Sequence, residues 1–163
     1  MNKSEQFRQS VLNQIEQACQ LVKRDPSTVQ LLAVSKTHPS QTLREMYAVG
    51  QRCFGENYLQ EALTKIDELQ DLDIEWHFIG HVQRNKTKHL AETFDWVHGV
   101  DRFIIAERLS KQRLENQKPL NICIQVNIDG QNSKDGCQPN EVLELVHQIS
   151  QLPNIRLRGL MVI

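Results

Sequence analysis

The chain has 163 residues, a formal net charge of −1, 39% hydrophobic residues and 24% charged residues. This composition is typical of one soluble globular domain and excludes a disordered, collagen-like or disulfide-rich chain. The near-neutral charge gives no general electrostatic attraction to nucleic acid or to an anionic membrane surface. No apolar run approaches the roughly 20 residues that a membrane-spanning helix needs.

The amino-terminal residues and the spacing of the cysteines indicate the cellular compartment of the protein. Residues 1–10 are polar and lack the apolar core of a signal peptide. The cysteines Cys19, Cys53, Cys123 and Cys137 lie far apart without a CxxC motif, so their spacing indicates neither a metal site nor a redox pair. We therefore expect a cytoplasmic protein with reduced thiols. The sequence contains no marked dimer motif, which leaves a monomer as the expectation.

The first predicted elements are a helix, a strand and a second helix. Residues 4–24 carry apolar side chains at helical period, which predicts one amphipathic helix. Residues 30–35 form a short apolar run without alternation, which is typical of a strand buried on both faces of a parallel sheet. The next helix opens near Pro39, and Gly50 is placed to end it.

The same alternation continues along the chain. Strands are predicted at 52–55, 75–80, 96–100, 121–128 and 156–163, and helices at 57–70, 84–92, 102–116 and 139–151. Strand–helix alternation predicts an α/β fold with a parallel sheet and right-handed crossovers, either doubly wound or a (β/α)8 barrel. No GxGxxG follows the first strand, which disfavours a dinucleotide-binding domain.

The length decides how much of a barrel this chain holds. A complete barrel usually needs about 200–250 residues, whereas this chain ends inside its predicted sixth strand. An open apolar strand is an unusual natural end, because its unpaired backbone groups invite aggregation. We therefore expect residues 1–163 to form a single, incomplete barrel domain with about six of eight β/α units, cut from a longer barrel.

Lys36 is the strongest candidate for chemistry. In parallel α/β folds ligands gather at the carboxyl ends of the strands, and Lys36 directly follows the first predicted strand. Its stem is expected to rise into the barrel mouth, where partial desolvation favours the neutral amine that attacks a carbonyl carbon. The alternative is a lysine that ends a strand and extends into water.

Other polar residues carry weaker signals. His77 and His81 stand four residues apart, but on a strand-to-loop segment their side chains do not share a helix face. A packed or hydrogen-bonded His77 is therefore expected rather than a metal ligand. The basic loop with Arg84, Lys86 and Lys88 is suited to a phosphate at a helix N-terminus, although a solvated helix start is the simpler interpretation. Without a GxSxG elbow, nothing indicates nucleophilic hydrolysis.

Several segments together carry a family resemblance. They are residues 32–37 (LAVSKT), 54–61 (FGENYLQE), 76–86 (WHFIGHVQRNK) and 157–163 (LRGLMVI), with Val126-Asn127-Ile128, Lys134 and Gly136 as a fifth. In this order and spacing the chain resembles the pyridoxal phosphate homeostasis proteins, which look like the barrel domain of bacterial alanine racemase standing alone. The resemblance runs from the first predicted helix to the last residue.

This resemblance implies a fold, a cofactor and a set of site residues. The fold is a (β/α)8 TIM barrel of the alanine racemase N-terminal type, and the cofactor is pyridoxal 5′-phosphate held as a Schiff base on Lys36. Asn57 is implied near the cofactor, and His77 and Met161 as residues that line the same mouth. Lys134 is a lysine that the family also carries, as a secondary cofactor contact or as a solvated loop lysine. In the family the phosphate is received by the last two β/α units of the barrel, and neither unit lies within residues 1–163.

The function that the resemblance implies is intracellular pyridoxal phosphate homeostasis without substrate turnover. The protein would buffer or deliver the cofactor, with pyridoxal-phosphate-dependent apoenzymes as candidate recipients and with no nucleic-acid or membrane partner. No metal ligand and no catalytic residue is expected.

Three alternatives stay open. A pyridoxal-phosphate-dependent amino-acid racemase needs proton donors on both faces of the cofactor, and in the resembling racemases one is a tyrosine from a second domain. Here only Tyr47 and Tyr58 occur, both in predicted helical segments. A barrel lysine that acts directly on a carbonyl substrate, as in class I aldolases, rests on fold class and Lys36 alone. An incomplete barrel that has lost function is the third alternative.

Overall fold

The computed structural model describes residues 3–131 and 133–163. Its strands form one sheet in the order β1-β2-β3-β4-β5-β6, and all neighbours are parallel. The strands are β1 (Ala33–Val34), β2 (Cys53–Glu56), β3 (Glu75–Phe78), β4 (Trp96–Val100), β5 (Leu120–Gln125) and β6 (Ile155–Met161). The α-helices are α1 (Lys3–Leu21), α2 (Ser40–Ala48), α3 (Leu59–Glu68), α4 (Thr87–Thr93), α5 (Phe103–Gln112) and α6 (Val142–Ile149). Short 3-10 turns are η1 (Pro26–Thr28), η2 (Arg84–Lys86) and η3 (Pro139–Glu141).

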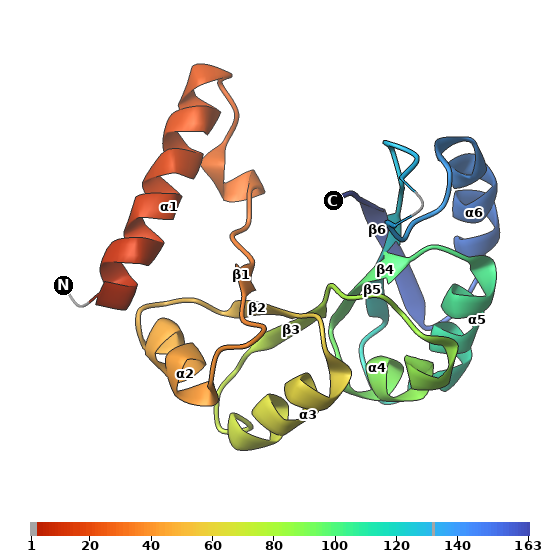
Figure 1. Cartoon of the computed structure of the whole chain (residues 1–163), viewed down its shortest axis with the longest axis horizontal. Coiled ribbons are helices and arrows are strands. Elements are labelled where there is room, and N and C mark those ends of the chain that lie inside the picture. The colour runs from red at the N-terminus through yellow and green to blue at the C-terminus, as the bar shows by residue number, and fades with distance from the viewer. Residues whose placement is uncertain (1–2, 132) are drawn as a thin grey trace.

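The arrangement is that of a partial (β/α)8 barrel. Figure 1 shows α2 to α6 on the outside of a curved sheet, with the strands following one another in sequence order. Sequential parallel strands with a helix in each connection are the repeating unit of this barrel. The predicted alternation and the fold class are therefore confirmed, and each predicted strand and helix lies within a few residues of its observed position.

The first strand is shorter and less buried than predicted. Only Ala33 and Val34 pair with β2, and Val34 is 50% exposed. Val34 is in register with Gly55 and so lies on the inner face of the sheet, which the outer helices do not cover. The prediction of burial on both faces was wrong for this strand, because in the described chain β1 has β2 as its only strand neighbour.

Helix α1 packs through Leu12, Ile15 and Cys19, which are half-buried or buried, and through the polar side chain of Arg8. Its predicted apolar stripe is largely open to solvent, with Phe7 63% and Val11 40% exposed. Arg8 instead links the helix to the turn before β2, donating to the Gly50 carbonyl at 3.1 Å and to Gln51 Oε1 at 3.3 Å. Among the described residues, no helix combines the length and the apolar character needed to cross a membrane.

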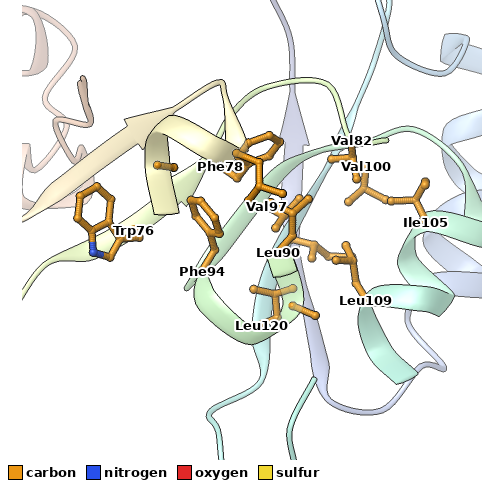
Figure 2. Close-up of a cluster of buried hydrophobic side chains, with 14 of the residues drawn as sticks. Trp76, Phe78, Val82, Leu90, Phe94, Val97, Val100, Ile105, Leu109 and Leu120 are labelled. Carbon is orange, nitrogen blue, oxygen red and sulfur yellow. The ribbon is translucent and has the colours of Figure 1, made fainter. Parts of the chain in front are cut away.

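The hydrophobic core lies between the sheet and the outer helices. Figure 2 shows side chains of β3, β4 and β5 packed against those of α4 and α5. Leu90, Leu109 and Leu120 are fully buried, and the rings of Phe78 and Phe94 meet edge-on at 5.4 Å. These contacts fix the positions of the strands whose carboxyl ends carry the candidate site.

We predict that Leu109→Ala destabilises the protein by about 2–5 kcal/mol, because it leaves a cavity in a region where the wild-type side chain is fully buried. The free energy of unfolding in urea measures the effect. Leu143→Ala is the matched control, since Leu143 on α6 is 82% exposed and its loss should change stability by no more than about 0.5 kcal/mol. Equal effects of the two substitutions would contradict the assignment of the core.

Candidate functional site

Lys36 lies in a tight turn directly after β1. His38 N donates to Ser35 O at 3.1 Å across the turn, and Thr37 has a left-handed φ of +66°. Thr37 N also donates to Glu61 Oε1 of α3 at 2.6 Å. The turn is thus tied to a neighbouring helix, and it presents Lys36 at the carboxyl end of β1.

The side chain of Lys36 is exposed to solvent. The expected partial desolvation is therefore not found, because β1 has a neighbour strand on one side only and its inner face is open. The structure agrees with the predicted place of Lys36 at a strand end, whereas its role as a cofactor ligand stays a prediction.

A buried ion pair lies beneath this turn. Lys65 Nζ of α3 is 2.8 Å from Glu56 Oε1 of β2 and 2.6 Å from Glu61 Oε1. The same ammonium donates to the backbone carbonyl of Ser35 at 2.7 Å, and Ser35 Oγ donates to Glu56 Oε1 at 2.5 Å. One ammonium group thus joins the turn after β1 to the next strand and to its following helix.

Because this ion pair is buried, separating its two charges would leave each of them without a partner and without water. The side chains of Lys65 and Glu56 are 6% and 0% exposed. Glu56 is in register with Phe78 of the core, so it lies on the outer face of the sheet, beneath α3 rather than in the barrel mouth. The three acceptors around Nζ use all three protons of the ammonium. The Lys65 hydrogen bond also holds the pKa of Glu61 below its usual value.

Asn57 follows β2 and has an unsatisfied acceptor. Its Oδ1 is buried without a hydrogen-bond partner among the described residues. A Cβ on Gly80, at the end of β3, would lie 2.2 Å from the backbone oxygen of Asn57, so only glycine permits this approach. Asn57, Gly80 and Lys86 share the lining of a cavity of about 330 Å³.

A second unsatisfied amide follows β5. Asn127 is 6% exposed, and its Oδ1 has no hydrogen-bond partner in the part of the chain that the structure describes. Its Nδ2 donates to the carbonyls of Gln131 and Lys134 at 2.9 and 3.2 Å, which holds the following loop. Buried acceptors without a donor are uncommon in folded proteins, so both amides are suited to a ligand that brings N–H or O–H groups.

Met161 and Lys134 lie at the carboxyl end of β6. Met161 is half-buried, in register with Gln125, and its carbonyl accepts from Val126 N at 2.9 Å. Lys134 Nζ is 2.5 Å from Asp129 Oδ2 and donates to the Ile163 carbonyl at 3.3 Å. Lys134 therefore reaches the carboxyl end of β6, but its ammonium is already paired with Asp129 of the same loop. Cofactor contact by either residue stays a prediction.

His77 is packed and hydrogen-bonded, as predicted. The residue is 5% exposed, and its ring stacks on the ring of Trp96 with centroids 5.3 Å apart. Nδ1 lies 2.9 Å from His98 Nε2, and Nε2 lies 2.9 Å from Glu75 Oε1 at the amino end of β3. Burial lowers the pKa of His77, and burial together with nearby His77 lowers the pKa of His98 to about 4. A place in the mouth stays a prediction, because the Glu75 contact lies toward the amino end of β3 and the His98 contact toward the carboxyl end of β4.

The basic loop forms an ordinary helix start. Arg84 is exposed, and its carbonyl accepts from Thr87 Oγ1 at 3.0 Å as η2 passes into α4. Lys88 is exposed and lies 3.8 Å from Glu92 along the same helix. The solvated interpretation of this loop agrees with these contacts.

Sequence reasoning missed the Lys65 network. Glu61 and Lys65 do stand at i and i+4 of a predicted helix, a spacing that favours an ion pair. Glu56, however, gives no local sign of a partner, since Lys65 reaches it across the strand–helix interface. Such a contact depends on how α3 packs against β2.

We predict that Lys65→Met destabilises the protein by about 3–5 kcal/mol, because it leaves the Glu56 carboxylate buried and unpaired. Unfolding in urea should show that Glu56→Gln combined with Lys65→Met is less destabilised than the sum of the two single changes. Arg44→Met is the control: it breaks the exposed pair with Asp71 and should cost about 1 kcal/mol or less. Strict additivity in the double variant would contradict a coupled buried pair.

Comparison with known proteins places the chain in a family. Residues 9–163 match the model of the alanine racemase N-terminal domain. The chain is 57% identical over 153 residues to the pyridoxal phosphate homeostasis protein of Pseudomonas aeruginosa, covering 94% of this chain and 66% of that protein. It is 50% identical over 161 residues to the protein of the same name from Pasteurella multocida, covering 98% and 69%. The chain thus spans about two-thirds of the length of these curated relatives.

Solved structures agree with this placement. PipY of Synechococcus elongatus with pyridoxal phosphate bound is 43% identical, with a TM-score of 0.78 over 91% of this chain and 69% of that one. Alanine racemase from E. faecalis, at 16% identity and a TM-score of 0.66 over 94% of this chain and 41% of that one, shares the fold. The chain therefore belongs to the alanine racemase N-terminal domain family and, within it, to the pyridoxal phosphate homeostasis proteins.

Proposed function

We propose that this chain binds pyridoxal 5′-phosphate as a Schiff base on Lys36 and serves intracellular homeostasis of the cofactor without turning over a substrate. The observation that carries the proposal is the position of Lys36, an exposed amine on a turn that is fixed from below at the carboxyl end of β1. The bound pyridoxal phosphate in PipY and the names of the curated relatives support it.

The residues present fit the reactive part of this cofactor. Pyridoxal phosphate supplies an aldehyde, and the neutral Lys36 amine would attack its carbon to form a C=N bond with loss of one water molecule. The unpartnered Oδ1 atoms of Asn57 and Asn127 offer acceptors for polar hydrogens of a bound ring system. In barrels of this class the phosphate is commonly held after strands seven and eight, whereas β1 to β6 offer the amine and these acceptors.

The Lys65 network would position the amine. It fixes Ser35 through the backbone carbonyl and Thr37 through its backbone N–H, the two residues that flank Lys36. A backbone held on both sides reduces the freedom that Lys36 loses when it bonds to a ligand. The exposed side chain keeps its amine accessible to a cofactor arriving from solvent.

Storage and racemisation place different demands on this site. A store needs an amine and a means of retention, whereas a racemase also needs a proton donor on each face of the cofactor. Tyr47 Oη accepts from Asp73 N at 3.3 Å, and its ring lies 3.8 Å from the Arg52 guanidinium. Tyr58 precedes α3 and is 57% exposed. The contacts that engage Tyr47 favour storage over the runner-up, a racemase-like enzyme.

The proposal extends to the setting of the protein. We take residues 1–163 as one incomplete cofactor-binding barrel domain, acting as a monomer in the cytoplasm. Pyridoxal-phosphate-dependent apoenzymes are the proposed recipients of the cofactor, and neither nucleic acid nor a membrane is a proposed partner.

We predict that Lys36→Ala abolishes Schiff-base formation while leaving the fold intact, because the exposed side chain contributes little packing. The chain is mixed with pyridoxal phosphate, its visible absorption recorded, and the product reduced with borohydride and mapped by mass spectrometry. The expected label is a phosphopyridoxyl group on Lys36. Lys134→Ala, which removes a lysine paired with Asp129, should keep that label. Unaltered visible absorbance in Lys36→Ala would sink the assignment.

We also predict no racemase activity above that of free cofactor. The chain loaded with pyridoxal phosphate is incubated with L-alanine, and the D-enantiomer is measured by chiral chromatography. Racemisation that is present in the loaded chain and lost in Lys36→Ala would replace storage by the enzymatic alternative. Without specific labelling of Lys36, the chain would count as functionally inert.

A further inference from the structure

A cluster of metal-ligating groups lies on the inner face of the sheet, away from Lys36. Cys53 and Glu75 open β2 and β3 and are in register with each other. Glu75 and His77 are two residues apart on β3, so their side chains lie on the same face. One ligand atom from each of the three residues lies within 4.8 Å of the other two.

The Cys53 thiol and the His77 imidazole both contact the same carboxylate oxygen of Glu75. Cys53 Sγ is 3.3 Å from Glu75 Oε1, and His77 Nε2 is 2.9 Å from the same oxygen. Thiolate, imidazole and carboxylate are the ligand types that zinc uses, and three protein ligands with one open position are typical of zinc sites that keep a bound water. The interior of a barrel is ordinarily filled by branched apolar side chains, so packing alone gives no reason for these residue types.

The imidazole is oriented as a metal ligand requires. His77 Nδ1 faces His98 Nε2 at 2.9 Å, and the His77 ring stacks on Trp96 with an interplanar angle of 13°. A ligating histidine almost always gives its other ring N–H to a hydrogen-bond acceptor, which fixes the tautomer and the ring orientation. His98 and Trp96 supply this support from the neighbouring strand β4.

The cluster is open to a cation from the amino ends of the strands. Cys53 and His77 are buried, whereas the Glu75 side chain is 41% exposed. A cavity of about 390 Å³ is lined by Cys53 and Glu75 together with the groups of opposite charge Asp73, Asp95, Arg52 and Lys118. The charges of Asp73 and Asp95 are matched there by Arg52 and Lys118, so the Glu75 carboxylate is the excess negative charge at this entrance. The open side of Glu75 leaves room for a water ligand.

We propose that Cys53, Glu75 and His77 bind a divalent cation of the zinc class, with the fourth position open to water. On binding, the Cys53 thiol loses its proton to solvent. The proton by which His77 Nε2 donates to Glu75 is exchanged through solvent to Nδ1, so that Nε2 and the Glu75 carboxylate each bind the metal. His77 then donates from Nδ1 to His98 Nε2, for which His98 carries its own proton on Nδ1. The site lies toward the amino ends of the strands and does not depend on pyridoxal phosphate.

The test is titration of the full chain, free of pyridoxal phosphate, with Zn²⁺ alone by calorimetry and with Co²⁺ as a spectroscopic probe. The expected result is saturable binding of one ion per chain and a thiolate-to-cobalt charge-transfer band. Cys53→Ser should abolish that band, and Glu75→Gln should weaken zinc binding by about tenfold or more. Removal of the supporting imidazole in His98→Gln should weaken zinc binding by about 10–100-fold.

Two controls separate this site from adventitious binding and from the cofactor site. Cys19→Ser removes another buried thiol, on α1, and should leave the cobalt band and the zinc affinity unchanged, as should Lys36→Ala. Circular dichroism checks each fold, and Glu75→Gln keeps the test decisive if Cys53→Ser does not fold, since the Glu75 side chain is partly exposed. Absence of saturable binding, or equal zinc affinity in wild type and Glu75→Gln, would overturn the proposal.

Discussion

The buried ion pair between Lys65 and Glu56 is the constraint on which the candidate site depends. Its charges are almost fully removed from water, so the pair tolerates little displacement: each charge would otherwise be buried without compensation. The same ammonium holds the carbonyl of Ser35, and through Glu61 it is linked to the backbone of Thr37. The turn that carries Lys36 is therefore positioned by a strand–helix interface beneath it rather than by contacts in the mouth.

The two ends of the sheet are chemically distinct. At the carboxyl ends, the exposed amine of Lys36 follows β1, and the unpartnered amide oxygens of Asn57 and Asn127 follow β2 and β5. Toward the amino ends, Cys53, Glu75 and His77 converge on the inner face. In barrels of this kind chemistry resides at the carboxyl ends, and the opposite end serves stability. A cation bound at the amino ends would follow that division, because it would cross-link β2 and β3 without approaching Lys36.

The chain belongs to the pyridoxal phosphate homeostasis proteins, and this membership relates the exposed Lys36 amine to the aldehyde of that cofactor. Holding a reactive aldehyde requires an accessible amine on a fixed backbone, and the turn after β1 has both properties. Racemisation would require further proton donors at the same place, and the tyrosine side chains are engaged elsewhere or exposed. On the proposed function, the amine and its supporting network would account for storage with fewer groups than turnover would need.

The sequence by itself determined the β/α order, the place of Lys36 at the end of the first strand and the hydrogen-bonded state expected for His77. These features follow from local periodicity and from residues close in the chain, as in the run 30–36. Only the tertiary structure decided that Lys65 meets Glu56 and that Cys53 meets Glu75, because strand register and helix packing join residues 9 and 22 positions apart. It also decided the exposure of Val34, since the burial of a strand depends on which neighbours cover it and not on its own apolar side chains.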